Sequence, residues 1–367
     1  MLPLPDVIVV GGGAIGASCA RELALGGAQV TLIDRPGAAG EAWRASAGML
    51  AAQVEVNPDD PILELALAGR EYFSQHGAAL QRTTGIDIGM TQTGILEVVH
   101  AEADVDALKE RVAWQRQQAL RAGWLDAQEV ADGWPWLAPT LGAFWSPEDG
   151  LVIPDQLVAA FIADATRLGA KVISDTVVGL DVDAAGLRGV IGERDRYTAG
   201  TVVIAAGAWS GRLQSLPRPL SVEPVRGQMI SFPWPENAPP AIVYGAGCYL
   251  LHRNGEMLVG ATVEHAGFAA TVTDAGRAQL HERASGNCPA FATLAPTRSW
   301  AGLRPGTPDG LPIIGPEPRL RGLWYATGHG RNGILMSGIT GQLLARGIAG
   351  ADVGDALAPF RPERFWD

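Results

Sequence analysis

The stretch Val7-Ile8-Val9-Val10-Gly11-Gly12-Gly13-Ala14-Ile15-Gly16 decides the fold of this chain. Its four apolar residues predict a buried strand, and the glycines at 11, 13 and 16 predict a tight turn that opens a helix. A second apolar run follows and ends at Asp34, 18 residues after Gly16. This order of strand, glycine-rich turn, helix, strand and acid is typical of a dinucleotide-binding βαβ unit.

Each part of this unit has a physical task. Gly11 permits the tight turn, and Gly13 lets backbone N–H groups approach a pyrophosphate at the positive end of the helix. Gly16 lets the helix pack closely on the strand, and Asp34 can accept a hydrogen bond from a ribose hydroxyl. The motif does not distinguish FAD from a nicotinamide dinucleotide. NADP is the poorest candidate because Asp34 would repel its ribose phosphate, although the adjacent Arg35 keeps it from being excluded.

Composition and charge narrow the class of protein. A chain of 367 residues predicts two domains, and 28 Lys and Arg against 39 Asp and Glu give a net charge of −11. Without a dense basic run, a nucleic-acid partner is not expected. The three cysteines lie far apart with no histidine at ligand spacing, which predicts no metal site and a reduced, cytoplasmic setting. Residues 1–5 resemble no leader, and no apolar run reaches membrane-spanning length, so we expect neither a leader nor an integral membrane segment.

The pattern along the chain predicts an α/β fold in which two domains alternate. Apolar strands at 202–205 and 323–327 extend the dinucleotide domain, as does a helix from Asp155 to about Gly169 that precedes a strand at 171–174. Another helix is predicted over 61–84.

The intervening segments predict a second domain. A strand at 95–99 is followed by a polar helix over about 104–121, and short strands at 228–232, 248–252 and 257–259 predict an antiparallel sheet. We therefore expect a Rossmann-like dinucleotide domain interleaved with an antiparallel substrate domain of α+β type. The dinucleotide domain would comprise residues 1–90, 146–219 and 305–367, and the substrate domain residues 91–145 and 220–304.

Two arginines are candidates for binding a substrate. Arg304 and Arg331 each lie in a loop rich in glycine or proline, with no acid close by in the sequence. A planar guanidinium pairs with a carboxylate through two parallel hydrogen bonds, so these loops favour a carboxylate substrate. The alternative is that both are solvated loop arginines.

Taken together, the motifs resemble the FAD-dependent amino-acid oxidases of the D-amino-acid oxidase family, and within it the glycine oxidases of the thiamine pathway. The resemblance extends over nearly the whole chain. It rests on residues 9–16, 45–50 (ASAGML), 258–262 (LVGAT), 300–310 (WAGLRPGTPDG) and 328–335 (GHGRNGIL).

The resemblance implies a noncovalent FAD. The residues that it implies for holding this cofactor, with the glycines of the first turn, are Gly11, Gly13, Ala14, Ile15, Gly16, Asp34, Arg35, Ala42, Trp43, Ala47, Gly48, Met49, Val178, His329, Gly330, Arg331, Asn332, Gly333, Ile334 and Leu335. It also implies that Arg304 grips the carboxylate of the substrate, that Arg331 lies beside the substrate, and that Tyr249 reaches the pocket as a hydrogen-bond donor. Tyr244 is the competing tyrosine.

The implied activity is the oxidative deamination of glycine, with sarcosine and small D-amino acids as secondary substrates. The partners would be the amino acid and oxygen, and the products glyoxylate, ammonia and hydrogen peroxide, feeding thiazole synthesis for thiamine. Homo-oligomerisation is left open. One alternative is a D-amino-acid dehydrogenase that passes electrons to a quinone, and another is a sensor or scaffold that binds a flavin or NAD without turnover.

The chain also departs from the family pattern. Ala42 and Trp43 replace two threonines expected at the flavin site, and Val263 replaces a methionine expected near the pocket. Gly302 and Leu303 occupy the region where sarcosine oxidase relatives carry a cysteine that links the flavin, which is why the FAD is expected to be noncovalent.

Overall fold

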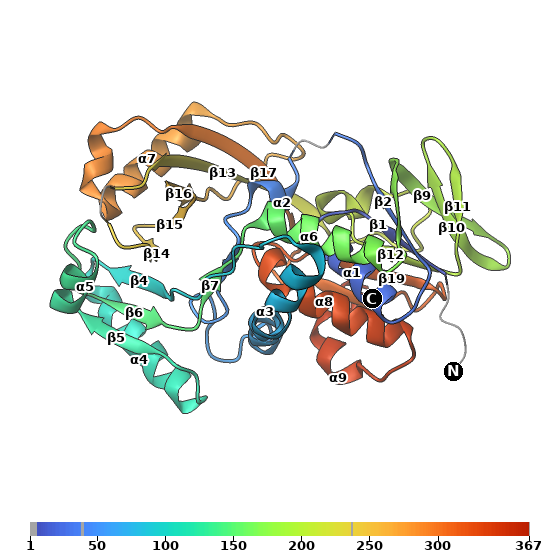
Figure 1. The fold of residues 1–367 in the computed structure, drawn as a ribbon, viewed down its shortest axis with the longest axis horizontal. Helices are drawn as coiled ribbons and strands as arrows, with labels where there is room; N and C mark the ends of the chain where they lie inside the picture. The colour runs from blue at the N-terminus through green and yellow to red at the C-terminus, as the bar shows by residue number, and fades with distance from the viewer. Residues whose placement is uncertain (1–5, 38–39, 236–237, 367) are drawn as a thin grey trace.

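The computed structural model describes residues 6–37, 40–235 and 238–366. Two large sheets lie side by side along the long axis of the molecule (Figure 1). The expectation that no leader precedes the first strand concerns residues 1–5, which lie outside the described residues. Within the described ranges, no helix combines the length and the apolar character needed to cross a membrane.

The first sheet is the one predicted from the glycine-rich stretch. Its strands β1, β2, β8, β12 and β19 are parallel, and β18 is antiparallel to β19 at one edge. The α/β fold with a Rossmann-like sheet is thereby confirmed. In order across the sheet, the strands are β18 (Ile313–Pro316), β19 (Leu323–Thr327), β12 (Thr201–Ile204), β1 (Val7–Val10), β2 (Val30–Asp34) and β8 (Lys171–Ser174).

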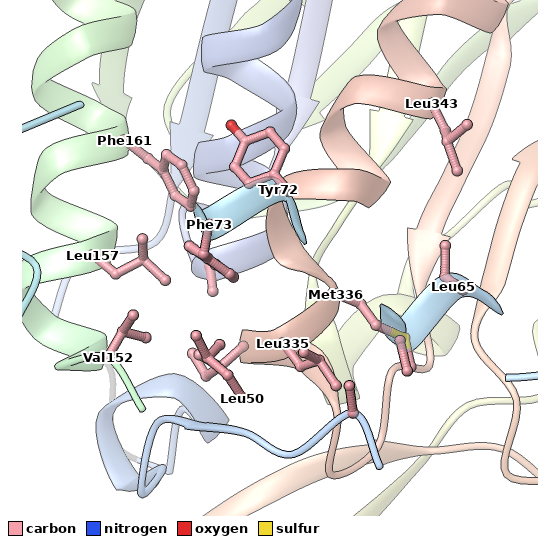
Figure 2. Packing of buried hydrophobic residues seen from close by; sticks show 14 of the residues in the cluster. Leu50, Leu65, Tyr72, Phe73, Val152, Leu157, Phe161, Leu335, Met336 and Leu343 are labelled. Carbon is pink, nitrogen blue, oxygen red and sulfur yellow. The ribbon is translucent and has the colours of Figure 1, made fainter. Parts of the chain in front are cut away.

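Four helices pack together beside this sheet. They are α1 (Ala14–Leu25), α3 (Leu63–Thr84), α6 (Pro154–Arg167) and α8 (Gly333–Ile348). Figure 2 shows Tyr72 and Phe73 of α3 among apolar side chains of α6 and α8. A Cβ on Gly338 would lie 2.0 Å from the Tyr72 ring, so a glycine is needed where α8 meets α3. Helix α8 begins at Gly333, so the second glycine-rich turn itself supplies its first residues.

The second sheet has eight strands. In order across it, they are β17 (Arg298–Gly306), β13 (Glu223–Pro233), β16 (Glu256–Gly260), β15 (Cys248–Arg253), β14 (Ile242–Gly245), β4 (Ile95–Val99), β6 (Gly142–Ser146) and β5 (Gly123–Asp126). All neighbours are antiparallel except β14 and β4, which pair in parallel. The prediction of antiparallel pairing holds for the other neighbours. It fails for this pair because β4 belongs to an earlier passage of the chain through the sheet.

Helices cover both faces of the second sheet. Helix α7 (Asp274–Asn287) packs its Leu280 and Ala284 on one face. On the other face, Val112 of α4 (Glu102–Gln117) packs in a cluster that also holds residues 47, 51 and 54 of the first part of the chain. The smaller elements include α2 (Ala42–Ala45), β3 (Met49–Leu50), α5 (Ala127–Gly133), β7 (Gly150–Leu151), β9 (Val177–Asp183), β10 (Gly186–Gly192), β11 (Arg196–Thr198), the 3-10 turn η1 (Gly207–Arg212) and α9 (Gly354–Leu357).

A Gly16→Ala variant tests the close packing of α1 on the first turn. A Cβ at this position would lie 1.8 Å from the Gly11 carbonyl oxygen, which is backbone and cannot move aside without shifting the strand. We expect the free energy of unfolding to fall by at least about 2 kcal/mol, measured by urea denaturation. Gly133→Ala is the matched control because, beyond its own helix and chain neighbours, no atom of the described residues lies within 4 Å of its Cβ position. Equal stability of the two variants would contradict the packing argument.

Candidate active site

The first glycine-rich turn forms a cradle that has no room for side chains. Gly11 has φ +104°, and a Cβ there would lie 2.5 Å from the Ala205 carbonyl oxygen. A Cβ on Gly12 would lie 2.9 Å from the Asp34 carboxylate. The N-cap residue of α1 is Gly13, which has no side chain to cap the helix. The first N–H groups of a 12-residue helix are therefore free for an anion, which fits the diphosphate of a dinucleotide.

Asp34 is the last residue of β2, next to this cradle, and Arg35 follows it. The guanidinium of Arg35 stacks 3.7 Å above the ring of Trp209, which lies in η1. Its Nη2 is buried and makes no hydrogen bond to the described residues. Asp175 donates its backbone N–H to the Asp34 carbonyl at 2.9 Å, and Val178 follows shortly after on β9. Asp34, Arg35 and Val178, three of the predicted cofactor residues, thus lie on neighbouring segments at or just past the ends of β2 and β8.

The segment that carries Ala42, Trp43, Ala47, Gly48 and Met49 runs from the cradle to the second sheet. The Trp43 indole covers the first turn, since its Cδ1 lies 3.1 Å from the Cβ position of Gly13. The two threonine hydroxyls expected at this place are therefore absent, and the Trp43 ring lies there instead. The Arg44 guanidinium stacks on this ring at 4.2 Å. Gly48 has φ +85°, and a Cβ there would lie 2.0 Å from the Val152 carbonyl oxygen.

The second glycine-rich turn carries the other predicted cofactor residues, 329–335. His329 is buried, and burial lowers the pKa of its imidazole to about 3, so the ring is neutral at pH 7. Its Nε2 lies 3.1 Å from the Thr340 hydroxyl, whereas its Nδ1 is buried without a partner in the described residues. Gly330 donates its N–H to the Pro305 carbonyl at 2.9 Å, which ties this turn to β17 next to Arg304.

A row of residues crosses five strands of the second sheet and faces these turns. The cross-strand partners are, in order, Tyr244, Tyr249, Gly260, Met229 and Trp300. Opposed residues point to the same face of a sheet, and the two tyrosine rings lie 5.8 Å apart between centroids. A Cβ on Gly260 would lie 2.3 Å from the Tyr249 hydroxyl, so this glycine makes room for the ring.

Arg304 lies on the same face. Its guanidinium occupies the place of a side chain on Gly227, whose Cβ would lie 2.4 Å from Nη1 and Nη2. It donates to the Thr262 carbonyl at 3.1 Å and pairs with no carboxylate in the part of the chain that the structure describes. Burial lowers the pKa of Arg304, and the nearby Arg331 acts in the same direction. Burial also raises the pKa of Tyr249 to about 12, so its hydroxyl stays protonated.

A carboxylate that the sequence analysis missed completes this cluster. Glu55 accepts a hydrogen bond from the Tyr244 hydroxyl at 2.7 Å and one from Arg331 at 2.7 Å. The side chain of Glu55 is 12% exposed, whereas that of Arg331 is 63% exposed. Met49 lies next to the same hydroxyl, with its sulfur 3.4 Å away. Glu55 belongs to no motif, and its partners are so distant in the sequence that no local pattern could have identified it.

A buried polar network places the segment that carries Glu55. Asp149 accepts hydrogen bonds from the backbone N–H groups of Ala52 and Gln53 at 3.1 Å, and from Arg70 at 2.8 Å.

The structure brings together all three predicted catalytic residues, Tyr249, Arg304 and Arg331. Val263 is 72% exposed, and Leu303 is buried.

A His329→Asn variant tests the neutral buried imidazole. The unfolded chain binds a proton on this residue near pH 6.5, whereas the folded chain does so only near pH 3. Protonation therefore favours unfolding, and stability is lost as the pH falls below 6.5. The loss from this residue amounts to about 2 kcal/mol at pH 5.

Between pH 7 and pH 5, we expect the free energy of unfolding to fall by about 2 kcal/mol less in His329→Asn than in the unmodified protein. The measurement is urea unfolding at a fixed FAD concentration. His100→Asn removes an exposed histidine and is the control. An unchanged pH dependence in His329→Asn would show that the buried imidazole does not contribute it.

Comparison with known proteins agrees with this geometry. The family model described as DAO, FAD dependent oxidoreductase, matches residues 6–346. A glycine oxidase of Geobacillus kaustophilus is 35% identical over 97% of this chain and 96% of its own. A crystal structure of glycine oxidase from that organism superimposes with a TM-score of 0.92, at 34% identity over 99% of both chains.

Two further relatives broaden the comparison. The bifunctional protein ThiO/ThiG of Synechocystis sp. is 33% identical over 98% of this chain, which covers 54% of that protein. The crystal structure of an iminodiacetate oxidase from Chelativorans sp. BNC1 has a TM-score of 0.90 at 26% identity, covering 97% of this chain and 99% of that one. With a family model that matches most of its length, the chain belongs to the DAO family of FAD-dependent oxidoreductases.

Proposed function

We propose that this protein oxidises glycine, with sarcosine and small D-amino acids as secondary substrates. From glycine, oxygen and water, the products are glyoxylate, ammonia and hydrogen peroxide. The observation that carries the proposal is the Arg304 guanidinium, which lies over Gly227 beside Tyr249 and pairs with no carboxylate of the described chain. A small amino acid offers the carboxylate that this guanidinium lacks.

The protein supplies the binding and the orientation. FAD, when bound, would supply the redox chemistry as the acceptor of a hydride from the α-carbon of the substrate. Arg304 holds the carboxylate, and the protonated hydroxyl of Tyr249 donates a hydrogen bond within the pocket. Neither a nucleophile nor a metal is needed in this scheme. The neutral form of the substrate amine is the reactive one.

The residues proposed to hold FAD are those of the two glycine-rich turns and of the segments between them. The first turn and the N-terminus of α1 bind the diphosphate, Asp34 binds a ribose hydroxyl, and Arg35 and Val178 line the same end of the sheet. The 42–49 segment and the turn at 329–335 connect this end with Arg304.

The cellular setting is also part of the proposal. Electrons pass to oxygen, and the product serves thiazole synthesis in a cytoplasmic thiamine pathway; the resemblance of the chain to glycine oxidases and to a ThiO/ThiG protein supports this. We retain the division into an FAD domain (residues 1–90, 146–219 and 305–367) and a substrate domain (residues 91–145 and 220–304). Association into a homo-oligomer is compatible with both the oxidase and the dehydrogenase activity.

The visible spectrum of the purified protein tests this function directly. We expect a flavin spectrum that bleaches when glycine is added without air and recovers, with release of peroxide, when air is readmitted. Bleaching by glycine without recovery in air, but with recovery on addition of a quinone, would identify a dehydrogenase. A flavin spectrum that neither glycine, sarcosine nor D-alanine changes would refute the proposal.

An Arg304→Ala variant tests the carboxylate contact. Loss of a buried charge-assisted pair costs about 2 kcal/mol, so kcat/KM for glycine should fall about 30-fold. Gly227→Ala should act in the same direction, because its methyl group displaces the guanidinium without changing the arginine. The control is Arg196→Ala, whose side chain is 65% exposed and pairs with Asp181. An unchanged KM for glycine in both pocket variants would exclude Arg304 as the carboxylate ligand.

A further inference from the structure

We propose that Glu55 selects substrates with a single carboxylate by occupying Arg331, so that only Arg304 is left to bind one. The inference rests on the proposed function and extends it to the substrate class. It concerns amino acids that carry a second carboxylate, on the nitrogen or on the side chain. These would be excluded although the pocket contains two arginines.

The two arginines differ in their partners. Arg331 donates to the Glu55 carboxylate at 2.7 Å, and the described part of the chain gives Arg304 only the carbonyl of Thr262. The same Glu55 oxygen accepts the Tyr244 hydroxyl, so it is fixed from two sides. Tyr244 in turn packs beside Tyr249, which places the Glu55–Arg331 pair next to the Arg304 end of the pocket.

Counting charges shows what the pocket can accept. Arg304 and Arg331 are positive, Glu55 is negative, and the two tyrosines are neutral because burial raises the pKa of both. Arg253, the next cation, keeps its charge, but its Nη1 is directed to the carbonyls of Ser46 and Ala47. One substrate carboxylate on Arg304 therefore gives each of Arg304, Arg331 and Glu55 a partner of opposite charge. A second carboxylate would find Arg331 already paired and would face the negative charge of Glu55.

Arg331 cannot turn to a second carboxylate without a cost. Its own side chain is largely exposed, but the Glu55 side chain is only 12% exposed and would be left without its cation. Removal of one partner from a poorly solvated pair leaves an uncompensated charge. The burial of Glu55 thus keeps Arg331 paired with it and away from a second carboxylate.

A Glu55→Gln variant is the decisive change, because it keeps the shape and a hydrogen-bond acceptor for Tyr244 but frees the charge of Arg331. Sarcosine and iminodiacetate are matched substrates that differ by one carboxylate on the nitrogen substituent, and D-alanine and D-aspartate are matched in the side chain. We expect kcat/KM for the dicarboxylate, divided by that for the monocarboxylate, to rise at least about tenfold in one or both pairs.

A binding measurement makes the test independent of turnover. Acetate and malonate are titrated against the flavin spectrum of the FAD-loaded protein, and the ratio of their dissociation constants is compared between variants. We expect Glu55→Gln to shift this ratio at least about tenfold towards malonate.

Three further variants separate charge from shape. Tyr244→Phe removes a hydrogen bond from Glu55 but keeps its charge, so it should not reproduce the shift. The double variant Glu55→Gln/Arg331→Met should lose the gain, because the freed cation is gone. Asp183→Asn makes the same type of change in an exposed pair with Arg188 and is the control for net charge.

The outcomes distinguish this inference from the proposed function. If Glu55→Gln lowers activity on both substrate classes equally and leaves the malonate-to-acetate ratio unchanged, Glu55 only positions Arg331 and the selection proposal is wrong. If the unmodified protein does not oxidise glycine, the proposed function fails, and the binding ratio still decides whether Glu55 selects against a second carboxylate.

Discussion

The buried pair between Arg70 and Asp149 is the constraint on which the pocket depends. Burial raises the pKa of the Asp149 carboxyl, and the neighbouring Arg70 opposes this shift. Asp149 also accepts the backbone N–H of Gln53, so one carboxylate joins helix α3, the turn before β7 and the segment that leads to Glu55. Loss of one partner from such a pair costs about 3–5 kcal/mol. The position of the acid in the pocket is therefore fixed by charges that never contact a substrate.

Glycine shapes both halves of the site by leaving space. In the first sheet, the glycines at 11 and 16 let strand, turn and helix approach until backbone atoms meet. In the second sheet, Gly260 and Gly227 clear the face under the Tyr249 ring and the Arg304 guanidinium. The 42–49 segment joins the halves, since the Trp300 indole donates to the Ala45 carbonyl at 3.1 Å. The cofactor end and the substrate end are thus built by one rule, in which a missing side chain admits a larger group.

The sequence predicted those parts of the molecule that depend on local spacing. The residues from Val7 to Asp34 predicted the Rossmann-like sheet because strand, turn and helix follow one another directly. Arg304 and Arg331 could be singled out because each lies among glycines or prolines with no acid close by in the sequence. The expectation of a loop is wrong for Arg304, which lies on strand β17 because its backbone pairs with β13. Glu55 could not, since it meets Arg331 across 276 residues and depends on the folded position of Asp149. The parallel pairing of β4 with β14 was missed for the same reason.

The order of strands in the first sheet has a consequence for biosynthesis. Strand β1 pairs on one side with β2 and on the other with β12, where Val7 lies opposite Thr201. Roughly 190 residues must be translated between β1 and β12, which takes about 10–40 s at ordinary elongation rates. During this time the apolar edge of β1 has no partner and is a site for mispairing. A nascent chain of this topology therefore exposes a strand edge that chaperones at the ribosome can bind. Slower translation would lengthen the time for which this edge has no partner.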